Sequence, residues 1–215
     1  MQVSVDKVYK RIRRAKILDD ISLKIESGKI IGLMGPNGSG KTMLMRAICG
    51  LIRPDKGKVV IDGKVLGKDI SFPPSVGILI ENPAFISKYT GFHNLKLLAG
   101  IKAVITDEDI DQILIDVGLD PNDRRTYRKY SLGMKQRLGI AAALMENPDL
   151  ILVDEPFNAL DADGINLVHD LLVKHKKRGA LVIVACHDKE QMDILADVVY
   201  VMASGRLVES YEQFH

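Results

Sequence analysis

One segment of the chain combines glycines, a lysine and a threonine at spacings that suit phosphate binding. Gly35, Gly38 and Gly40 are followed by Lys41 and Thr42, which matches the pattern G-x-x-x-x-G-K-[ST]. The glycines let successive backbone N–H groups point at phosphate oxygens, and a helix beginning behind the loop adds its positive end. The Lys41 ammonium can reach the β- and γ-phosphates, and the Thr42 hydroxyl can bind Mg²⁺. The predicted nucleotide contacts are Gly35, Pro36, Asn37, Gly38, Ser39, Gly40, Lys41, Thr42 and Met43.

A second segment ends an apolar run with two carboxylates. Residues 150–153 are all apolar and predict a buried strand, and Asp154 and Glu155 follow at its end, where ligands of doubly wound sheets bind. Asp154 is predicted to hold Mg²⁺, and Glu155 to orient or deprotonate the water that attacks the γ-phosphorus. With Lys41, these residues predict a magnesium-dependent hydrolase of nucleoside triphosphates.

A third segment, residues 131–137, precedes an apolar helical stripe. Ser131 is well placed to cap that helix, and Gly133 follows two residues later. With these residues in place, the chain resembles the nucleotide-binding subunits of ATP-binding-cassette (ABC) transporters, whose signature commonly reads Leu-Ser-Gly-Gly-Gln. Residues 130–134 here read Tyr-Ser-Leu-Gly-Met, so Ser131 and Gly133 match and the other three positions depart.

The resemblance extends along essentially the whole chain. Residues 158–161 resemble the D-loop of the family, which implies a nucleotide contact for Asp161. His187 follows an apolar run and resembles the switch histidine, whose imidazole can donate to a γ-phosphate oxygen. The resemblance therefore implies Lys41, Glu155 and His187 as the catalytic residues.

Two further positions fit the family pattern less well. Glu81, followed by Asn82-Pro83, stands where the family has its Q-loop glutamine. Its carboxylate can approach Mg²⁺, which makes Glu81 a predicted metal contact beside Thr42 and Asp154, but it also repels phosphate. The aromatic residue that commonly stacks on adenine aligns near Ile12, with Tyr9 three residues earlier, so either residue is a candidate for that contact.

The resemblance implies an Mg²⁺-dependent ATPase that powers a separate transmembrane permease. Two such subunits, identical or different, face head to tail, with each ATP between Lys41 of one subunit and Ser131 and Gly133 of the other. The expected location is cytoplasmic, peripheral to the inner face of the cell membrane. The sequence is most similar to subunits of bacterial exporters for antibiotics and antimicrobial peptides, while the cargo belongs to the permease.

Two other classes of function compete with this interpretation. A soluble ABC-type ATPase acting on nucleic acid or ribosomes would use basic clusters such as those within residues 7–16 and 124–129. No tandem second cassette or long heptad insertion is present, and the net charge is only +2, so no nucleic acid partner is expected. A GTPase-like switch would use Asp161 to Gly164 as D-x-x-G, but no Asn-Lys-x-Asp motif for reading guanine occurs.

The elements that must position these residues follow a mixed α/β pattern. Short apolar runs, typical of parallel strands buried on both faces, occupy residues 30–34, 76–80, 150–153, 181–185 and 198–202. Earlier, alternation over residues 21–25 and a hairpin around Asp62-Gly63 predict antiparallel strands. We therefore expect a phosphate-loop NTPase core with a mainly parallel sheet and an N-terminal antiparallel part. One domain, residues 1–215, is expected to consist of this core at 1–86 and 148–215 and an inserted α-helical lobe at 87–147 that carries the signature.

Composition sets the remaining expectations. With 215 residues, 47% of them hydrophobic, the chain can bury a sizeable core without a disulfide or metal. Cys49 and Cys186 lie in apolar segments, which predicts buried free thiols in a reducing compartment. No secretory signal is evident, and no apolar run approaches the ~18 residues that span a bilayer. The chain is therefore expected to have no membrane-spanning segment of its own.

Overall fold

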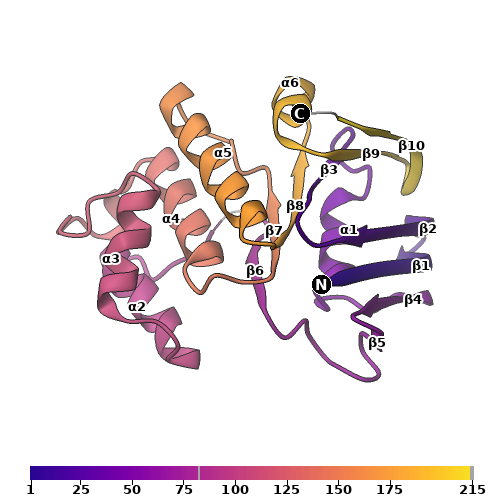
Figure 1. The fold of residues 1–215 in the computed structure, drawn as a ribbon, viewed down its shortest axis with the longest axis horizontal. Helices are drawn as coiled ribbons and strands as arrows, with labels where there is room; N and C mark the ends of the chain where they lie inside the picture. The colour runs from indigo at the N-terminus through magenta and orange to yellow at the C-terminus, as the bar shows by residue number, and fades with distance from the viewer. Residues whose placement is uncertain (82, 214–215) are drawn as a thin grey trace.

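The computed structural model describes residues 1–81 and 83–213 and contains two sheets flanked by helices (Figure 1). Asn82, part of the turn expected after Glu81, lies outside the described residues. The larger sheet has the strand order β10-β9-β3-β8-β7-β6. Its strands are β3 (Ile30–Met34), β6 (Val76–Leu79), β7 (Leu150–Asp154), β8 (Leu181–Cys186), β9 (Val198–Ala203) and β10 (Arg206–Glu212). All pairs are parallel except β9 with β10, which confirms the mainly parallel sheet.

The smaller sheet is antiparallel, and its strands all come from the N-terminal part of the chain (Figure 1). It has the order β2-β1-β4-β5, with strands β1 (Gln2–Ile12), β2 (Ala15–Glu26), β4 (Lys56–Ile61) and β5 (Lys64–Val65). Asp62 and Gly63 join β4 to β5 with φ values of 47° and 79°, as the primed hairpin turns require. The expected hairpin and antiparallel part are therefore confirmed.

Helices separate or cover the strands. They are α1 (Lys41–Ile48), α2 (Gly91–Lys102), α3 (Asp107–Asp116), α4 (Leu132–Leu144), α5 (Ala162–Lys177) and α6 (Lys189–Leu195), with a short 3₁₀ turn η1 (Tyr127–Lys129). Helices α2, α3 and α4 gather at the end of the molecule away from the antiparallel sheet (Figure 1). The described residues between β6 and β7 contain helices and no strand, as the pattern indicates, whereas the division into core and lobe stays a prediction.

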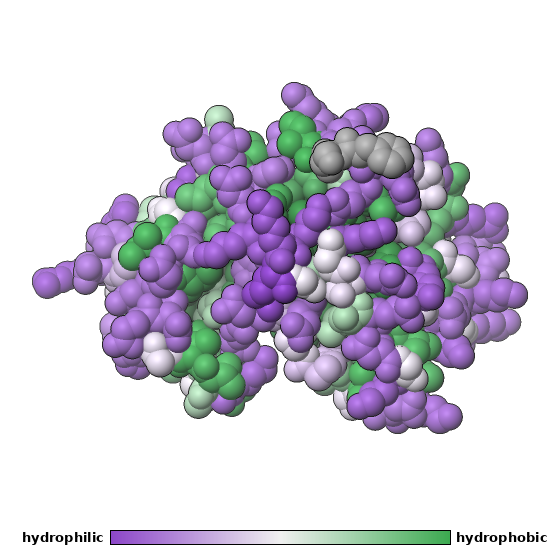
Figure 2. Space-filling model, in the orientation of Figure 1, coloured by the Kyte–Doolittle hydropathy of each residue, from purple (hydrophilic) through white to green (hydrophobic). Residues whose placement is uncertain are grey.

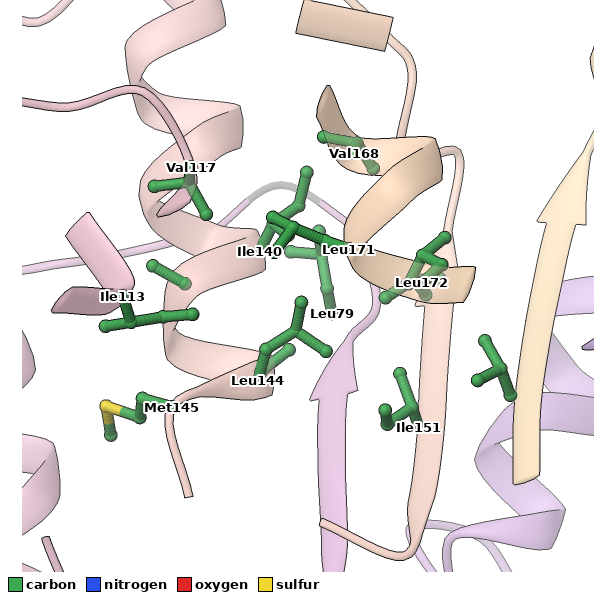
Figure 3. Packing of buried hydrophobic residues seen from close by; sticks show 14 of the residues in the cluster. Leu79, Ile113, Val117, Ile140, Leu144, Met145, Ile151, Val168, Leu171 and Leu172 are labelled. Carbon is green, nitrogen blue, oxygen red and sulfur yellow. The ribbon is translucent and has the colours of Figure 1, made fainter. Parts of the chain in front are cut away.

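The parallel sheet is buried on both faces because its side chains alternate between two apolar clusters. In β7, Ile151 and Val153 belong to the cluster with α3, α4, α5 and α6, while Leu150 and Leu152 belong to the cluster with α1 and the antiparallel sheet. Figure 3 shows Leu79 and Ile151 of the sheet packed beside α4 and α5. On the face shown in Figure 2, polar and charged side chains dominate and apolar ones form small separate groups. This burial fixes the strand ends that carry the candidate site.

The two cysteines match the expectation of buried free thiols. Cys49 and Cys186 are both free and buried, and burial raises the pKa of both thiols, that of Cys186 to about 11. None of the helices in residues 1–81 and 83–213 has the length and apolar content needed to cross a bilayer.

A buried histidine makes the fold sensitive to acid. His175 lies in α5 and is 5% exposed, and its Nδ1 has no hydrogen-bond partner among the described residues. Burial, together with the charges of Arg178 and Lys174, lowers the pKa of His175 from 6.5 to about 4, and Asp116 opposes the shift in part. The unfolded chain therefore takes up the proton at a higher pH than the folded chain. The contribution of neutral His175 to the free energy of unfolding is complete well above pH 6.5 and is lost progressively toward pH 4, by roughly 3 kcal/mol in total.

We expect His175→Leu to remove this acid sensitivity, because leucine fills a similar volume and binds no proton. The measurement is the free energy of unfolding in urea at several pH values between about 7.5 and 4.5. The exposed His93, replaced by glutamine, serves as the control and should keep the wild-type pH dependence. If wild type and His175→Leu lose stability equally on acidification, His175 is not the responsible group.

Candidate nucleotide site

The phosphate loop connects β3 to α1 and depends on glycines at positions that other residues rarely adopt. Gly35, Gly38 and Gly40 have φ values of 145°, 80° and 108°, in the range that favours glycine. Cβ atoms added to Gly35 and Gly40 would lie 2.2 Å from the Met202 carbonyl oxygen and 2.8 Å from the Ile17 carbonyl oxygen. The loop is therefore held by the end of β9 on one side and by β2 on the other.

Lys41 and Thr42 occupy the first positions of α1, where backbone N–H groups and the helix dipole favour an anion. Lys41 is 5% exposed, and its Nζ donates to the carbonyl oxygens of Gly35 at 2.6 Å and Pro36 at 3.3 Å. The ammonium is thus held within the curl of the loop. In the same loop, the Ser39 hydroxyl is buried without a hydrogen-bond partner in the described part of the chain, which leaves it available to a phosphate oxygen.

Asp154 meets the phosphate loop at the end of β7. Its Oδ2 accepts a hydrogen bond from Thr42 Oγ1 at 2.5 Å, so the two predicted metal contacts lie together although they are far apart in the sequence. Burial raises the pKa of Asp154, and the hydrogen bond from Thr42 opposes part of that shift. A divalent cation would stabilise the ionised carboxylate here, and the hydroxyl and carboxylate oxygens suit Mg²⁺.

Glu155 follows Asp154 and is paired with His187. Its two carboxylate oxygens lie 3.0 and 2.9 Å from His187 Nδ1. Glu155 has φ 50°, an uncommon value for a side chain with a Cβ, and its backbone N–H donates to Ala185 of β8. Gln136 of α4, which sequence reasoning missed, donates from Nε2 to the carbonyl oxygens of Glu155 and Pro156 at 3.0 and 3.2 Å. The helix that follows the signature therefore helps to fix the strand end that carries Glu155.

Glu81 has a partner that the sequence did not indicate. Arg46 Nη2 of α1 lies 2.6 Å from Glu81 Oε1, and Glu81 itself has φ 64°. A carboxylate at position 81 repels phosphate, whereas the glutamine usual in the family does not. The positive charge of Arg46 offsets this repulsion. The only available signal was a cation four residues after Thr42, which the helical period places on the same face of α1. Glu81 thus lies at the site, paired with Arg46.

The phosphate loop, Glu81, Asp154 and Glu155 line one cavity of about 340 Å³, whereas His187 is not in its lining. This volume is within the usual size range of ligand pockets. The lining comprises Ile17, Asn37, Gly38, Ser39, Gly40, Lys41, Thr42, Met43, Glu81, Asp154 and Glu155. Neither candidate for stacking on adenine belongs to this lining. Tyr9 lines a different cavity with Leu18 and Asp19, and Ile12 is an exposed residue at the β1–β2 turn. The cavity lining includes the apolar residue Ile17, which sequence reasoning did not single out.

The signature residues lie in another cavity. Ser131 caps α4 by accepting from the Met134 N–H at 3.2 Å, which confirms the predicted cap. An added Cβ on Gly133 would lie 2.8 Å from the Ala159 carbonyl oxygen, so a larger residue would press on the segment containing Asp161. Asp161 caps α5 and accepts from Arg137 Nη2 at 2.9 Å. It lines this cavity and not that of the phosphate loop, where the Asp of a GTPase-type D-x-x-G would lie.

Among the described residues, the two cavities have no lining residue in common. The second cavity, of about 600 Å³, is lined by Gly118, Leu119, Ser131, Leu132, Gly133, Met134, Arg137, Ala159, Leu160 and Asp161. The phosphate-loop cavity contains none of these. Within one chain, the phosphate loop and the carboxylates of Asp154 and Glu155 therefore line one cavity. The N-terminus of α4, with Ser131 and Gly133, lines another.

Comparison with known proteins agrees with this arrangement. The family model described as ABC transporter matches residues 18–158. The uncharacterized ABC transporter ATP-binding protein YybJ of Bacillus subtilis (strain 168) is 48% identical over 208 residues, which cover 97% of this chain and 95% of that protein. The bacitracin transport ATP-binding protein BcrA of Enterococcus faecalis is 37% identical over 209 residues, covering 96% of this chain and 68% of that protein.

Solved structures confirm the fold. The dimeric structure of MJ0796, described as a bacterial ABC transporter cassette, superposes with a TM-score of 0.90 at 24% identity and covers 99% of both chains. The predicted α/β architecture with a phosphate-loop core is therefore correct.

Proposed function

The chain belongs to the ABC transporter family of ATP-binding proteins, and from that premise we propose that two ATPase subunits close head to tail to complete each ATP site. The chain is an ATP-binding and ATP-hydrolysing subunit of an ABC transporter. The observation that carries the proposal is the separation of the phosphate-loop cavity from the signature cavity within one chain. In the proposed dimer, ATP lies between Lys41 of one subunit and Ser131 and Gly133 of the other. Both a homodimer and a heterodimer fit this scheme.

The polar residues of the phosphate-loop cavity have proposed roles. The backbone N–H groups between residues 35 and 43, except at Pro36, would bind the phosphates, and Lys41 would contact the β- and γ-phosphates. Thr42 and Asp154 would hold Mg²⁺, with Glu81 as a further contact, and the ion would neutralise charge on the phosphates. The Thr42 hydroxyl oxygen and an Asp154 carboxylate oxygen lie 2.5 Å from one another. Oxygen ligands of this kind are the ones that Mg²⁺ prefers, which supports this assignment.

Glu155 and His187 are the proposed catalytic pair. Glu155 would orient and deprotonate the attacking water, and His187, whose Nδ1 lies 2.9 Å from Glu155, would hold that carboxylate in place. The remaining imidazole nitrogen of His187 can then donate to a γ-phosphate oxygen. On the partner side, Ser131, Gly133 and Asp161 would close the site over the same phosphate.

ATP hydrolysis by the dimer is proposed to drive conformational change in a separate transmembrane permease. The relatives include a protein named for bacitracin transport, which supports export of antimicrobial compounds as the direction and class of transport. The proposed location is cytoplasmic, at the inner face of the membrane. A nucleic-acid role has less support, because Lys10 and Arg125 of the two basic clusters form ion pairs with Asp55 and Asp123 at 2.8 Å.

The experiment that tests this function is purification of the affinity-tagged chain from membranes of its native cells. A polytopic membrane protein is expected to co-purify, and adding it in lipid should stimulate the ATPase activity of the chain. If the tagged chain is recovered with ribosomes or nucleic acid and no membrane protein, the transport proposal is wrong.

Glu81→Gln is expected to alter stimulation by the permease more than nucleotide binding. Nucleotide affinity should stay within about tenfold, because Thr42 and Asp154 remain as metal contacts. Stimulation should change because the substitution removes the ion pair with Arg46 that fixes the end of β6. The measurement is ATPase rate against ATP concentration, with and without the permease.

The matched variant Arg46→Gln breaks the same ion pair from the other side and should change stimulation in the same direction. Unchanged stimulation in both variants would reduce Glu81 to a strand-ending turn residue. A collapse of affinity in the isolated Glu81→Gln subunit would instead make Glu81 a primary metal ligand.

A further inference from the structure

A thiol, an imidazole and a carboxylate meet beside the phosphate-loop cavity. Strands β7 and β8 are parallel neighbours in which Asp154 lies opposite Ala185, so Glu155 and Cys186 come next at the same edge of the sheet. His187 follows Cys186 directly. The ligand atoms of Glu155, Cys186 and His187 all lie within 4.8 Å of one another. No sequence motif indicates this group, because it forms only when the two strands pair.

We propose that Glu155, Cys186 and His187 form an inhibitory site for Zn²⁺. Three atoms within 4.8 Å of one another share a point about 2.8 Å or less from each, so movements below ~1 Å would reach zinc bond lengths of ~2.0 to 2.3 Å. Thiolate, imidazole and carboxylate together suit Zn²⁺ and disfavour Mg²⁺, which prefers oxygen ligands. A water molecule or a phosphate oxygen would complete a tetrahedral site.

The ion can reach the site from the nucleotide side. The His187 and Glu155 side chains are 61% and 21% exposed, whereas Cys186 is 2% exposed and supplies the inner ligand. Coordination replaces the thiol proton of Cys186, which leaves to solvent. The bound ion would also occupy the space between Glu155 and His187, whose atoms now lie 2.9 and 3.0 Å apart.

Occupancy would stop hydrolysis and leave ATP binding intact. Zinc would engage Glu155 and His187, the pair proposed to act on water and the γ-phosphate. The backbone cradle, Lys41 and the Thr42–Asp154 pair are not ligands of the proposed site. The subunit would therefore retain ATP in an unhydrolysed state, which is the expected signature of this inhibition and not of competition for the nucleotide site.

The chain offers a matched pair of variants for the test. Cys49 and Cys186 are its two cysteines, both free and buried, and Cys49 lies after α1, in the other apolar cluster. ATPase activity is measured at fixed MgATP while buffered free Zn²⁺ is raised. Wild type and Cys49→Ala should be inhibited alike, and Cys186→Ala should need at least tenfold more zinc while keeping its metal-free activity within about threefold. Equal zinc sensitivity of Cys186→Ala and wild type would overturn the proposal.

A spectroscopic measurement tests the site without any ATP turnover. Co²⁺ added to the nucleotide-free protein should give a near-ultraviolet thiolate-to-metal absorption band in wild type and Cys49→Ala, and none in Cys186→Ala. Absence of the band in wild type would overturn the proposal even if the chain hydrolyses ATP as expected. Thermal melting shows whether each variant is folded. If Cys186→Ala unfolds, Cys186→Ser, which preserves the side-chain size more closely, takes its place in both measurements.

Discussion

Replacing Glu155 with glutamine is expected to lower ATP turnover by about 10²- to 10³-fold, while ATP still binds. The amide keeps the shape of the side chain but cannot accept a proton from the attacking water. It also replaces the carboxylate that faces His187 Nδ1 at 2.9 Å, so the histidine loses an anionic partner. The measurements are the ATPase rate and equilibrium binding of ATP to the same preparation.

The same variant tests the head-to-tail arrangement. Because ATP is retained, Glu155→Gln with ATP and Mg²⁺ should accumulate as a dimer in light scattering, and ADP should leave it monomeric. Glu209→Gln, an exposed substitution on β10, should match wild type in both turnover and mass. A monomer under all conditions would contradict the homodimer and leave the heterodimer, to be tested with the mate recovered from membranes. Wild-type turnover would remove Glu155 from the catalytic pair.

Lys41→Ala is expected to abolish measurable ATP hydrolysis and to weaken ATP binding by about 10²-fold. The buried ammonium would no longer contact the triphosphate, and a charge-assisted hydrogen bond to such an anion contributes about 1.5–3 kcal/mol. The loss also leaves the carbonyl oxygens of Gly35 and Pro36 without the donor that now joins them. Both effects act on the phosphate loop, so ATP binding and hydrolysis should be lost while the rest of the fold is kept.

Two controls separate a binding defect from unfolding. Lys41→Met retains much of the apolar stem and should fold with a melting temperature near wild type, yet remain inactive. Lys177→Ala removes an exposed cation from the end of α5 and should bind and hydrolyse ATP normally. If Lys41→Met hydrolyses ATP at the wild-type rate, Lys41 has no catalytic role and the proposed site is wrong.

The parallel strands and the site segments could be predicted because their signals are local. Apolar runs give the five central strands directly, and Gly35, Glu81, Asp154 and His187 follow such runs. Strand β1 was missed because Lys7, at φ 45°, accompanies a register shift between Val5 and Val8, so the buried valines do not alternate regularly. Strand β10 is mostly exposed and therefore carries little apolar pattern.

Contacts between distant segments could not be predicted in the same way. The pairing of Glu81 with Arg46 depends on where the end of β6 meets the side of α1. The placement of Tyr9 away from the phosphate-loop cavity depends on the register of β1 with its neighbours. Predicting such contacts requires knowing the distances between elements, and the periodicity and spacing of residues in the sequence do not give these distances.

The separation of the phosphate-loop and signature cavities also governs how ATP consumption responds to the amount of protein in the cell. If each complete site needs residues from two subunits, turnover by free subunits rises with the square of their concentration while they are scarce. Subunits made in excess of their permease would stay almost idle, whereas those gathered by a permease would meet at a high local concentration. ATP hydrolysis then depends on assembly of the transporter, and no dedicated inhibitory protein is needed to prevent it in free subunits.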